Sequence, residues 1–172
     1  MKAAGYTFKD AVMVDPDGNP LSFEILLSQP IWERISLPFA KNRAKLGIIA
    51  KVRAVDAAQY QKRMEAFDFD MVVDLFGQSL SPGNEQRDFF GSEAADREGG
   101  RNLMGIKSAA VDTLIDHVIF AADRAALVTA TRALYRVLLH SSLVIPQWHI
   151  SASRIAYWDK LGRPANNPTS GA

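Results

Sequence analysis

The sequence of 172 residues contains 20 basic and 19 acidic side chains, a net charge of +1, and 48% hydrophobic residues. That length and hydrophobic content are typical of one globular domain with its own core. The balanced charge argues against a nucleic-acid partner, which would need a basic patch. The absence of cysteine excludes thiolate zinc sites, cysteine nucleophiles and disulfides. No apolar run approaches the roughly 18 residues of a transmembrane helix.

Strands and helices are predicted to alternate in the first half of the chain. The turn cluster at 15–20 separates two apolar runs, which predicts two strands joined as a hairpin or by a tight connection. Apolar side chains then follow at roughly helical spacing over 30–46, with Pro30 at the start and Gly47 at the end. Pro38 is expected to kink this helix.

The chain continues with a second strand-helix-strand pattern. Residues 48–56 alternate between apolar and polar, as in a half-buried strand, and Asp56 is a candidate N-cap for a short helix over 57–67. Another strand is predicted from Phe69 onward. Strand, helix, strand, helix, strand in this order indicates an α/β unit whose strands are parallel where helices join them.

The second half is predicted to begin with two amphipathic helices, over 108–123 and 124–140, which form an antiparallel pair broken near Asp123. Two short strands are expected at 142–151 and 152–159. Four aromatic side chains are expected on core faces: Trp32, Trp148, Tyr157 and Trp158.

No catalytic or metal-binding motif is present. The three histidines, His117, His140 and His149, are too far apart for a short metal-ligand spacing, and His117 is interpreted as a helix-surface residue. Asp68, Asp70 and Asp74 would share one face of a strand, so an acid and base pair is conceivable, although structural roles are the favoured interpretation. Neither a metal nor a cofactor is expected.

The stretch DLFGQSLSPGNEQRDFFGS, at 74–92, follows the last predicted strand of the first half. Ligands of open α/β sheets tend to bind at the carboxyl ends of the strands, so residues 76–91 are predicted to form a cleft-facing loop. Phe76, Phe89 and Phe90 flank this loop. They could line a binding wall, or they could be buried and pin the loop in place.

The blocks FDFDMVVDLFGQSLSPGNEQRDFFGSEAAD, GGRNLMGIKSAAVDTLID and RALYRVLLHSSLVIPQWH resemble family 5 extracellular solute-binding proteins, the peptide receptors of ABC importers. The subgroup they resemble is the one tied to uptake of microcin C and related peptides. The resemblance covers nearly the whole chain and is specific in the block SLSPGNEQRDFF. It implies a fold: residues 1–172 as a single α/β lobe of a type II periplasmic binding protein, with a mixed sheet flanked by helices.

The same resemblance implies a function. The chain would be the peptide-binding lobe of a longer, two-lobed periplasmic receptor, which works without catalysis beside an importer permease in the membrane, and whose export signal lies outside this chain. In the oligopeptide-binding relatives an aspartate of the loop pairs with the amino group of the ligand, and Ser79 takes its place here. The expected ligand-binding residues are Phe76, Gly77, Gln78, Ser79, Leu80, Ser81, Asn84, Glu85 and Arg87.

Two other functions stay open on the sequence alone. One is a small hydrolase or transferase that uses Asp74 with Glu85 or His149, and the other is an interaction domain without a small ligand.

Overall fold

The computed structural model describes residues 4–148, 156–158, 160 and 162. Its strands are β1 (Thr7–Lys9), β2 (Val12–Val14), β3 (Ser22–Leu27), β4 (Ile49–Ala54) and β5 (Met71–Val72). Its α-helices are α1 (Glu33–Ala44), α2 (Ala57–Glu65), α3 (Glu85–Phe90), α4 (Ala109–Ile119) and α5 (Arg124–His140). Within the described residues, no helix combines the length and the apolar character needed to cross a bilayer.

The first two strands form a hairpin of their own. β1 pairs antiparallel with β2, and the two residues between them, Asp10 and Ala11, have φ angles of 50° and 63°. Positive φ at both positions is the backbone pattern of a type I′ hairpin turn. Both strands predicted around the turn at 15–20 are present, as β2 and β3, and they follow the tight-connection alternative rather than the hairpin: an isolated bridge between Val14 and Pro20 crosses the turn, and β3 pairs with β4 and β5.

The central sheet is parallel and has the order β4-β3-β5. β3 lies in the middle, and three consecutive residues on it, Ile25, Leu26 and Leu27, are buried because both faces of the strand are covered. The α/β unit predicted from the alternating pattern is confirmed. β5 is shorter than the predicted strand and pairs with β3 at only two positions.

The predicted helix boundaries of this unit are confirmed within a few residues. α1 continues through Pro38, and the kink expected at that residue stays a prediction. Gly47 follows it with φ of 74°, and a Cβ at this position would lie 2.7 Å from the backbone nitrogen of Met13. Glycine is therefore required both for the backbone angle and for the close approach of the hairpin. Asp56 caps α2 as predicted, accepting a hydrogen bond from Gln59 N at 2.9 Å.

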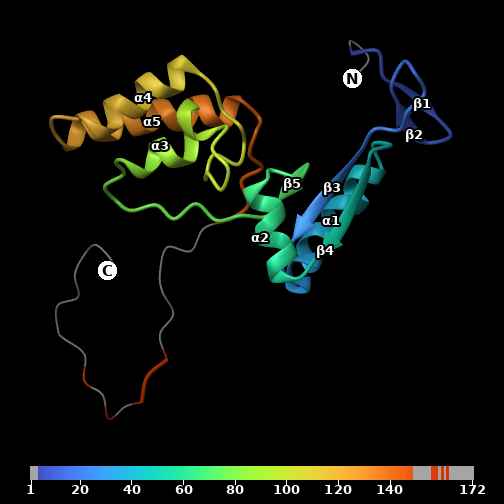
Figure 1. The fold of residues 1–172 in the computed structure, drawn as a ribbon, viewed down its shortest axis with the longest axis horizontal. Coiled ribbons are helices and arrows are strands. Elements are labelled where there is room, and N and C mark those ends of the chain that lie inside the picture. The colour runs from blue at the N-terminus through green and yellow to red at the C-terminus, as the bar shows by residue number, and fades with distance from the viewer. Residues whose placement is uncertain (1–3, 149–155, 159, 161, 163–172) are drawn as a thin grey trace.

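The second half of the chain builds a helical core. α4 and α5 form the predicted pair, and Asp123 caps α5 by accepting a hydrogen bond from Ala126 N at 2.8 Å. Figure 1 shows α3, α4 and α5 grouped together, apart from the sheet. Their shared core consists of Phe89, Phe90, Ile106, Val111, Ile115, Val118 and Leu134.

The strand predictions for the end of the chain were wrong where they can be checked. Residues 143–148 and 156–158 adopt no regular secondary structure, and 149–155 and 159 lie outside the described residues. Trp148, Tyr157 and Trp158 are 58%, 53% and 77% exposed, so they are not the core residues that their spacing suggested. Only Trp32, which is half-buried, agrees with that prediction.

Candidate functional site

The segment 73–84 leaves β5 and crosses to the helical part of the molecule, as Figure 1 shows. The predicted loop over 76–91 was too long, because its last third forms α3. The reason is packing: Phe89 and Phe90 are buried in the helical core, and a helical turn directs both rings into it. The exposed stretch that remains is 77–81.

An aromatic contact anchors the start of this stretch. The half-buried ring of Phe76 lies 5.4 Å from Phe89 in an edge-to-face arrangement, and 5.6 Å from Phe90. Pairs at such distances stabilise a structure beyond their buried area, by about 0.5–1.5 kcal/mol. The interpretation that these rings pin the loop is confirmed, and a ligand contact by Phe76 stays a prediction.

Two polar contacts, from Gln86 and from Arg124, hold the middle of the segment. Gln86, on the first turn of α3, is only 4% exposed and donates from Nε2 to Gln78 Oε1 at 2.7 Å and to Glu85 Oε1 at 3.1 Å. Arg124, at the start of α5, donates to the backbone carbonyl of Leu80. Contacts from two helices therefore fix the path of an otherwise exposed backbone.

Short-range hydrogen bonds shape the turn itself. Ser79 Oγ accepts from Ser81 N at 3.1 Å, and Glu85 Oε1 accepts from Gly83 N at 2.9 Å. Partial burial by itself would raise the pKa of Glu85. The hydrogen bonds to its carboxylate, from Gly83 N, from its own N–H and from Gln86, outweigh burial, so the pKa lies below its ordinary value.

Two other predicted site residues, Arg87 and Asn84, make no side-chain hydrogen bond to the stretch 77–81 among the described residues. Arg87 pairs with Asp116 of α4, with Nη2 2.8 Å from Oδ1, and its guanidinium lies 5.8 Å from the centre of the Phe120 ring. Asn84 is exposed and precedes α3 without capping it through its side chain. The contacts of Arg87 therefore attach α3 to α4 and to Phe120.

The carboxylates before the loop have structural roles. Asp70 accepts a hydrogen bond from Glu24 N at 2.8 Å, and Asp68 pairs with Arg63 at 3.0 Å. Asp74 is exposed, and its charge adds to burial in raising the pKa of Tyr60. The favoured interpretation of this cluster therefore holds for Asp68 and Asp70. His149, the third member of the hydrolase alternative, lies outside the described residues.

A hollow beside the carboxyl end of β3 escaped the sequence reasoning. It has a volume of about 580 Å³ and is lined by Gln29, Ile31, Trp32, Arg34, Ile35 and Trp148. The centres of the Trp32 and Trp148 rings lie 6.4 Å apart, although 115 residues separate the two in the sequence. The signal that could have found it is the run 28–32, which directly follows a buried parallel strand.

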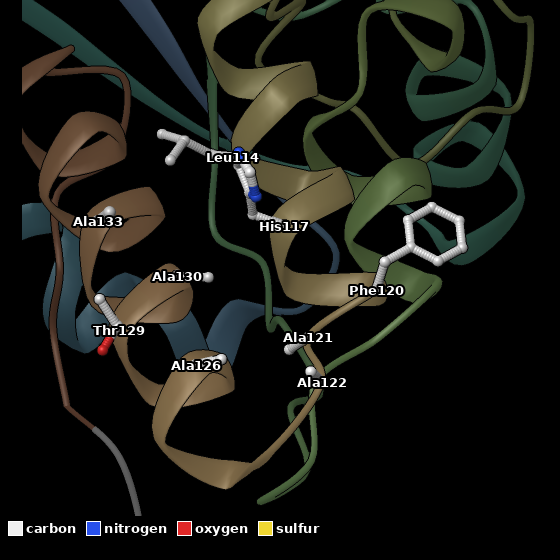
Figure 2. A pocket seen from close by; sticks show the side chains of 9 residues that line it. All are labelled: Leu114, His117, Phe120, Ala121, Ala122, Ala126, Thr129, Ala130 and Ala133. Carbon is white, nitrogen blue, oxygen red and sulfur yellow. The ribbon is translucent and has the colours of Figure 1, made fainter.

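Another hollow, of about 510 Å³, lies between α4 and α5 (Figure 2). Figure 2 shows Leu114 and His117 of α4 on one side and the methyl groups of Ala126, Ala130 and Ala133 of α5 on the other. His117 is exposed, as predicted. Because apart from His117 and Thr129 the lining is apolar, this hollow offers few groups that could orient a polar ligand.

The comparisons with known proteins connect this arrangement to binding proteins. A probable peptide-binding protein of Agrobacterium fabrum is 49% identical over 172 residues, which are 99% of this chain and 28% of that protein. The chain spans about a quarter of the length of the curated relatives it matches. No protein-family model matches the chain.

Solved structures share the fold. The oligopeptide-binding protein of Bacillus subtilis in complex with a nonapeptide has a TM-score of 0.71 and 24% identity, over 83% of this chain and 28% of that one. A periplasmic oligopeptide-binding protein of an oligopeptide ABC transporter from Thermotoga maritima, with mannohexaose bound, has a TM-score of 0.73 and 22% identity, over 84% and 28%. The chain is therefore similar, over nearly its whole length, to about a quarter of a probable peptide-binding protein, and it shares the fold of one segment of these oligopeptide-binding proteins.

Proposed function

We propose that this chain is a ligand-contacting segment of the periplasmic substrate-binding component of an ABC importer, which captures oligopeptides or peptide-like compounds. The observation that carries the proposal is the exposed stretch 77–81. It leaves the carboxyl end of a parallel sheet, where ligands of such folds bind, and contacts from α3 and α5 hold it in place. The high identity to a probable peptide-binding protein supports the same ligand class.

The proposed contacts differ in kind along the loop. Gln78, Ser79 and Ser81 carry exposed amide and hydroxyl groups, which suit the polar atoms of a peptide main chain. Leu80 is 66% exposed and could contact an apolar ligand side chain. The complete proposed set is Phe76, Gly77, Gln78, Ser79, Leu80, Ser81, Asn84, Glu85 and Arg87.

The hollow at the end of β3 is a second proposed contact surface. Trp32 and Trp148 offer apolar ring faces, and Arg34 offers a positive charge beside them. Together they suit an apolar side chain or a negative group of the ligand. Sequence reasoning had placed these tryptophans in the core, so this surface depends on the structure alone.

Binding without turnover is part of the proposal, as are a periplasmic location and an importer permease as the membrane partner. The similar Thermotoga protein is named as the periplasmic part of an ABC transporter. The hydrolase alternative gains no support from the comparisons. The carboxylate of Glu85 is also engaged by Gly83 N and Gln86, which leaves it poorly placed as a general base.

The test is calorimetry on the complete protein that contains this chain, with a peptide library and mannohexaose as the carbohydrate comparison. Micromolar or tighter binding of peptides, without product formation, is the expected result. The 172-residue chain alone should bind the same peptides too weakly to measure in the micromolar range, since a closed site buries most of a ligand. Hydrolysis of a bound peptide, or binding of the sugar only, would refute the proposal.

A further inference from the structure

A chain of hydrogen bonds with a fixed direction runs through the exposed loop. A carboxylate can only accept hydrogen bonds. Because Glu85 Oε1 lies 3.1 Å from the Gln86 side chain, Gln86 must direct its NH2 group, and not its carbonyl oxygen, toward it. This contact sets the orientation of the Gln86 amide.

The orientation of Gln86 then sets that of Gln78. The second proton of Gln86 Nε2 points to Gln78, 2.7 Å away, so Gln78 must face it with Oε1. The Nε2 group of Gln78, at the other branch of the same planar amide, is thereby turned away from Gln86. Gln78 is exposed, and among the described residues its Nε2 makes no hydrogen bond.

Neighbouring acceptors of the loop are engaged in the same way. Ser79 Oγ accepts from Ser81 N, which leaves its hydroxyl proton available to donate. The carbonyl oxygen of Leu80 accepts from Arg124. Each of these oxygens already accepts one hydrogen bond, whereas Gln78 Nε2 and the Ser79 hydroxyl proton stay available as donors to solvent or to a ligand.

Burial stabilises this orientation of the Gln86 amide. Gln86 is 4% exposed, so turning its amide over would place its carbonyl oxygen against the Glu85 carboxylate and leave a buried NH2 without a partner. A buried polar group without a hydrogen-bond partner destabilises the fold, so the observed orientation is strongly favoured. The hydrogen bonds to its carboxylate hold the pKa of Glu85 below its ordinary value, which favours the ionised form that can only accept hydrogen bonds.

We infer that Gln78 and Ser79 recognise an oxygen acceptor of the ligand, a carboxylate or a main-chain carbonyl, and that Gln86 is the positioning residue that aims the Gln78 amide at it. This inference rests on the proposed function. It specifies that the loop binds a hydrogen-bond acceptor of the ligand rather than a donor.

The decisive variant is Gln78→Glu in the complete protein. It keeps an oxygen for Gln86 to bond and replaces only the outward NH2 by a second oxygen. Affinity for a peptide that binds the wild type should fall about tenfold, because a donor is lost and a negative charge faces the ligand acceptor. Gln59→Glu, the same exchange at an exposed position of α2, is the matched control and should leave affinity unchanged.

Ligand variants identify the acceptor. If it is the terminal carboxylate, amidation of the peptide C-terminus weakens wild-type binding about tenfold, and Gln78→Glu then adds little further loss. If it is a main-chain carbonyl, amidation is neutral and Gln78→Glu weakens both peptides equally. Binding that Gln78→Glu leaves unchanged or improves would refute the inference, as would a loss seen only with a free ligand amine.

The hydrogen-bonded chain Glu85–Gln86–Gln78, here called the relay, can also be tested without ligand, on the 172-residue chain, by NMR of the side-chain amides. The Gln86 NH2 protons should exchange slowly and those of Gln78 rapidly. Gln86→Met should release Gln78 and lower affinity about threefold. Because Gln78 is exposed, its variant carries the test whether or not Gln86→Met folds. If no peptide binds, the proposed function fails, whereas protected Gln78 protons would refute the relay itself.

Discussion

Asn102 is predicted to be the polar group on which the helical part of the fold depends most. It is 0% exposed and makes three hydrogen bonds: Nδ2 donates to Gly91 O at 2.9 Å and to Ile106 O at 3.0 Å, and Oδ1 accepts from Ile106 N at 3.0 Å. It thereby ties the end of α3 to the segment that enters α4. We expect Asn102→Ala to destabilise the protein strongly.

The magnitude follows from the groups left without partners. Gly91 O also accepts from Ala94 N, so it keeps one hydrogen bond. The N–H and carbonyl of Ile106, which is 6% exposed, lose theirs. At about 1–3 kcal/mol for each unsatisfied buried group, the free energy of unfolding falls by about 2–6 kcal/mol. Water entering the space left by alanine favours the lower half of that range.

The assay is urea unfolding followed by circular dichroism at 222 nm, with Asn42→Ala as the control. Asn42 is exposed on α1, where alanine is a good helix former, so the control should be unchanged or slightly more stable. In a thermal scan, which serves as a second measurement, a chain of this size loses about 2–4 °C in Tm for each kcal/mol. A change of less than about 0.5 kcal/mol in Asn102→Ala, typical of a surface substitution, would refute the reasoning.

Asn102→Asp sharpens the same test, because it keeps the shape and replaces the donating NH2 by oxygen. The new oxygen faces two carbonyl oxygens, so the loss at neutral pH should exceed that of Asn102→Ala. Burial raises the pKa of such a carboxyl above its unfolded value. The destabilisation should therefore grow as pH rises through the unfolded pKa and shrink as pH falls below it, a trend that Asn102→Ala should lack.

Three further outcomes are expected. Ser79→Asp in the complete protein should shift preference toward ligands with a free amine, measured by calorimetry with free and N-acetylated peptides; equal changes for both would contradict this. Arg124→Gln should loosen the backbone at Leu80 and speed limited proteolysis there, while far-ultraviolet circular dichroism stays the same. The pKa of Glu85 is lower in the folded protein than in the unfolded chain, so its carboxylate should add to the free energy of unfolding above the unfolded pKa. This contribution should be lost as pH falls through the folded pKa. An NMR titration would follow the protonation through the chemical shift of the Gly83 amide, which donates to this carboxylate.

The sequence predicted the elements well where a local pattern decides them. The cap at Asp56, the break between two helices near Asp123 and the apolar periodicity of α4 and α5 could be predicted because each depends on residues close together in the sequence. Strand pairing was less readable, because the partner of β2 depends on the turn at Asp10 and Ala11, where neither residue is a glycine that would announce positive φ. The extent of the loop depended on where Phe89 and Phe90 find their core.

The exposed aromatic residues near the C-terminal end could not be predicted from local sequence either. Trp148 has apolar neighbours in sequence, Val144 and Ile145, yet no strand forms there within the described residues. Its ring instead lies beside Trp32, beyond the reach of any local pattern. Contacts between residues so far apart in sequence are set by the tertiary fold, so the hollow that they line could not be predicted from spacing.

For the candidate site, the residue types could be predicted from the sequence, whereas the orientation of their hydrogen-bonding groups required the structure. Gln78 and Ser79 each contain both donor and acceptor atoms, so their presence alone is compatible with a ligand amine or a ligand carboxylate. Glu85 removes the ambiguity for Gln78, from which it is two hydrogen bonds away. Its carboxylate can only accept, so it fixes the orientation of the Gln86 amide, which in turn fixes that of Gln78. Ligand polarity is therefore encoded by a residue that need not touch the ligand, and a comparison of loop residues that ignored Gln86 would miss it.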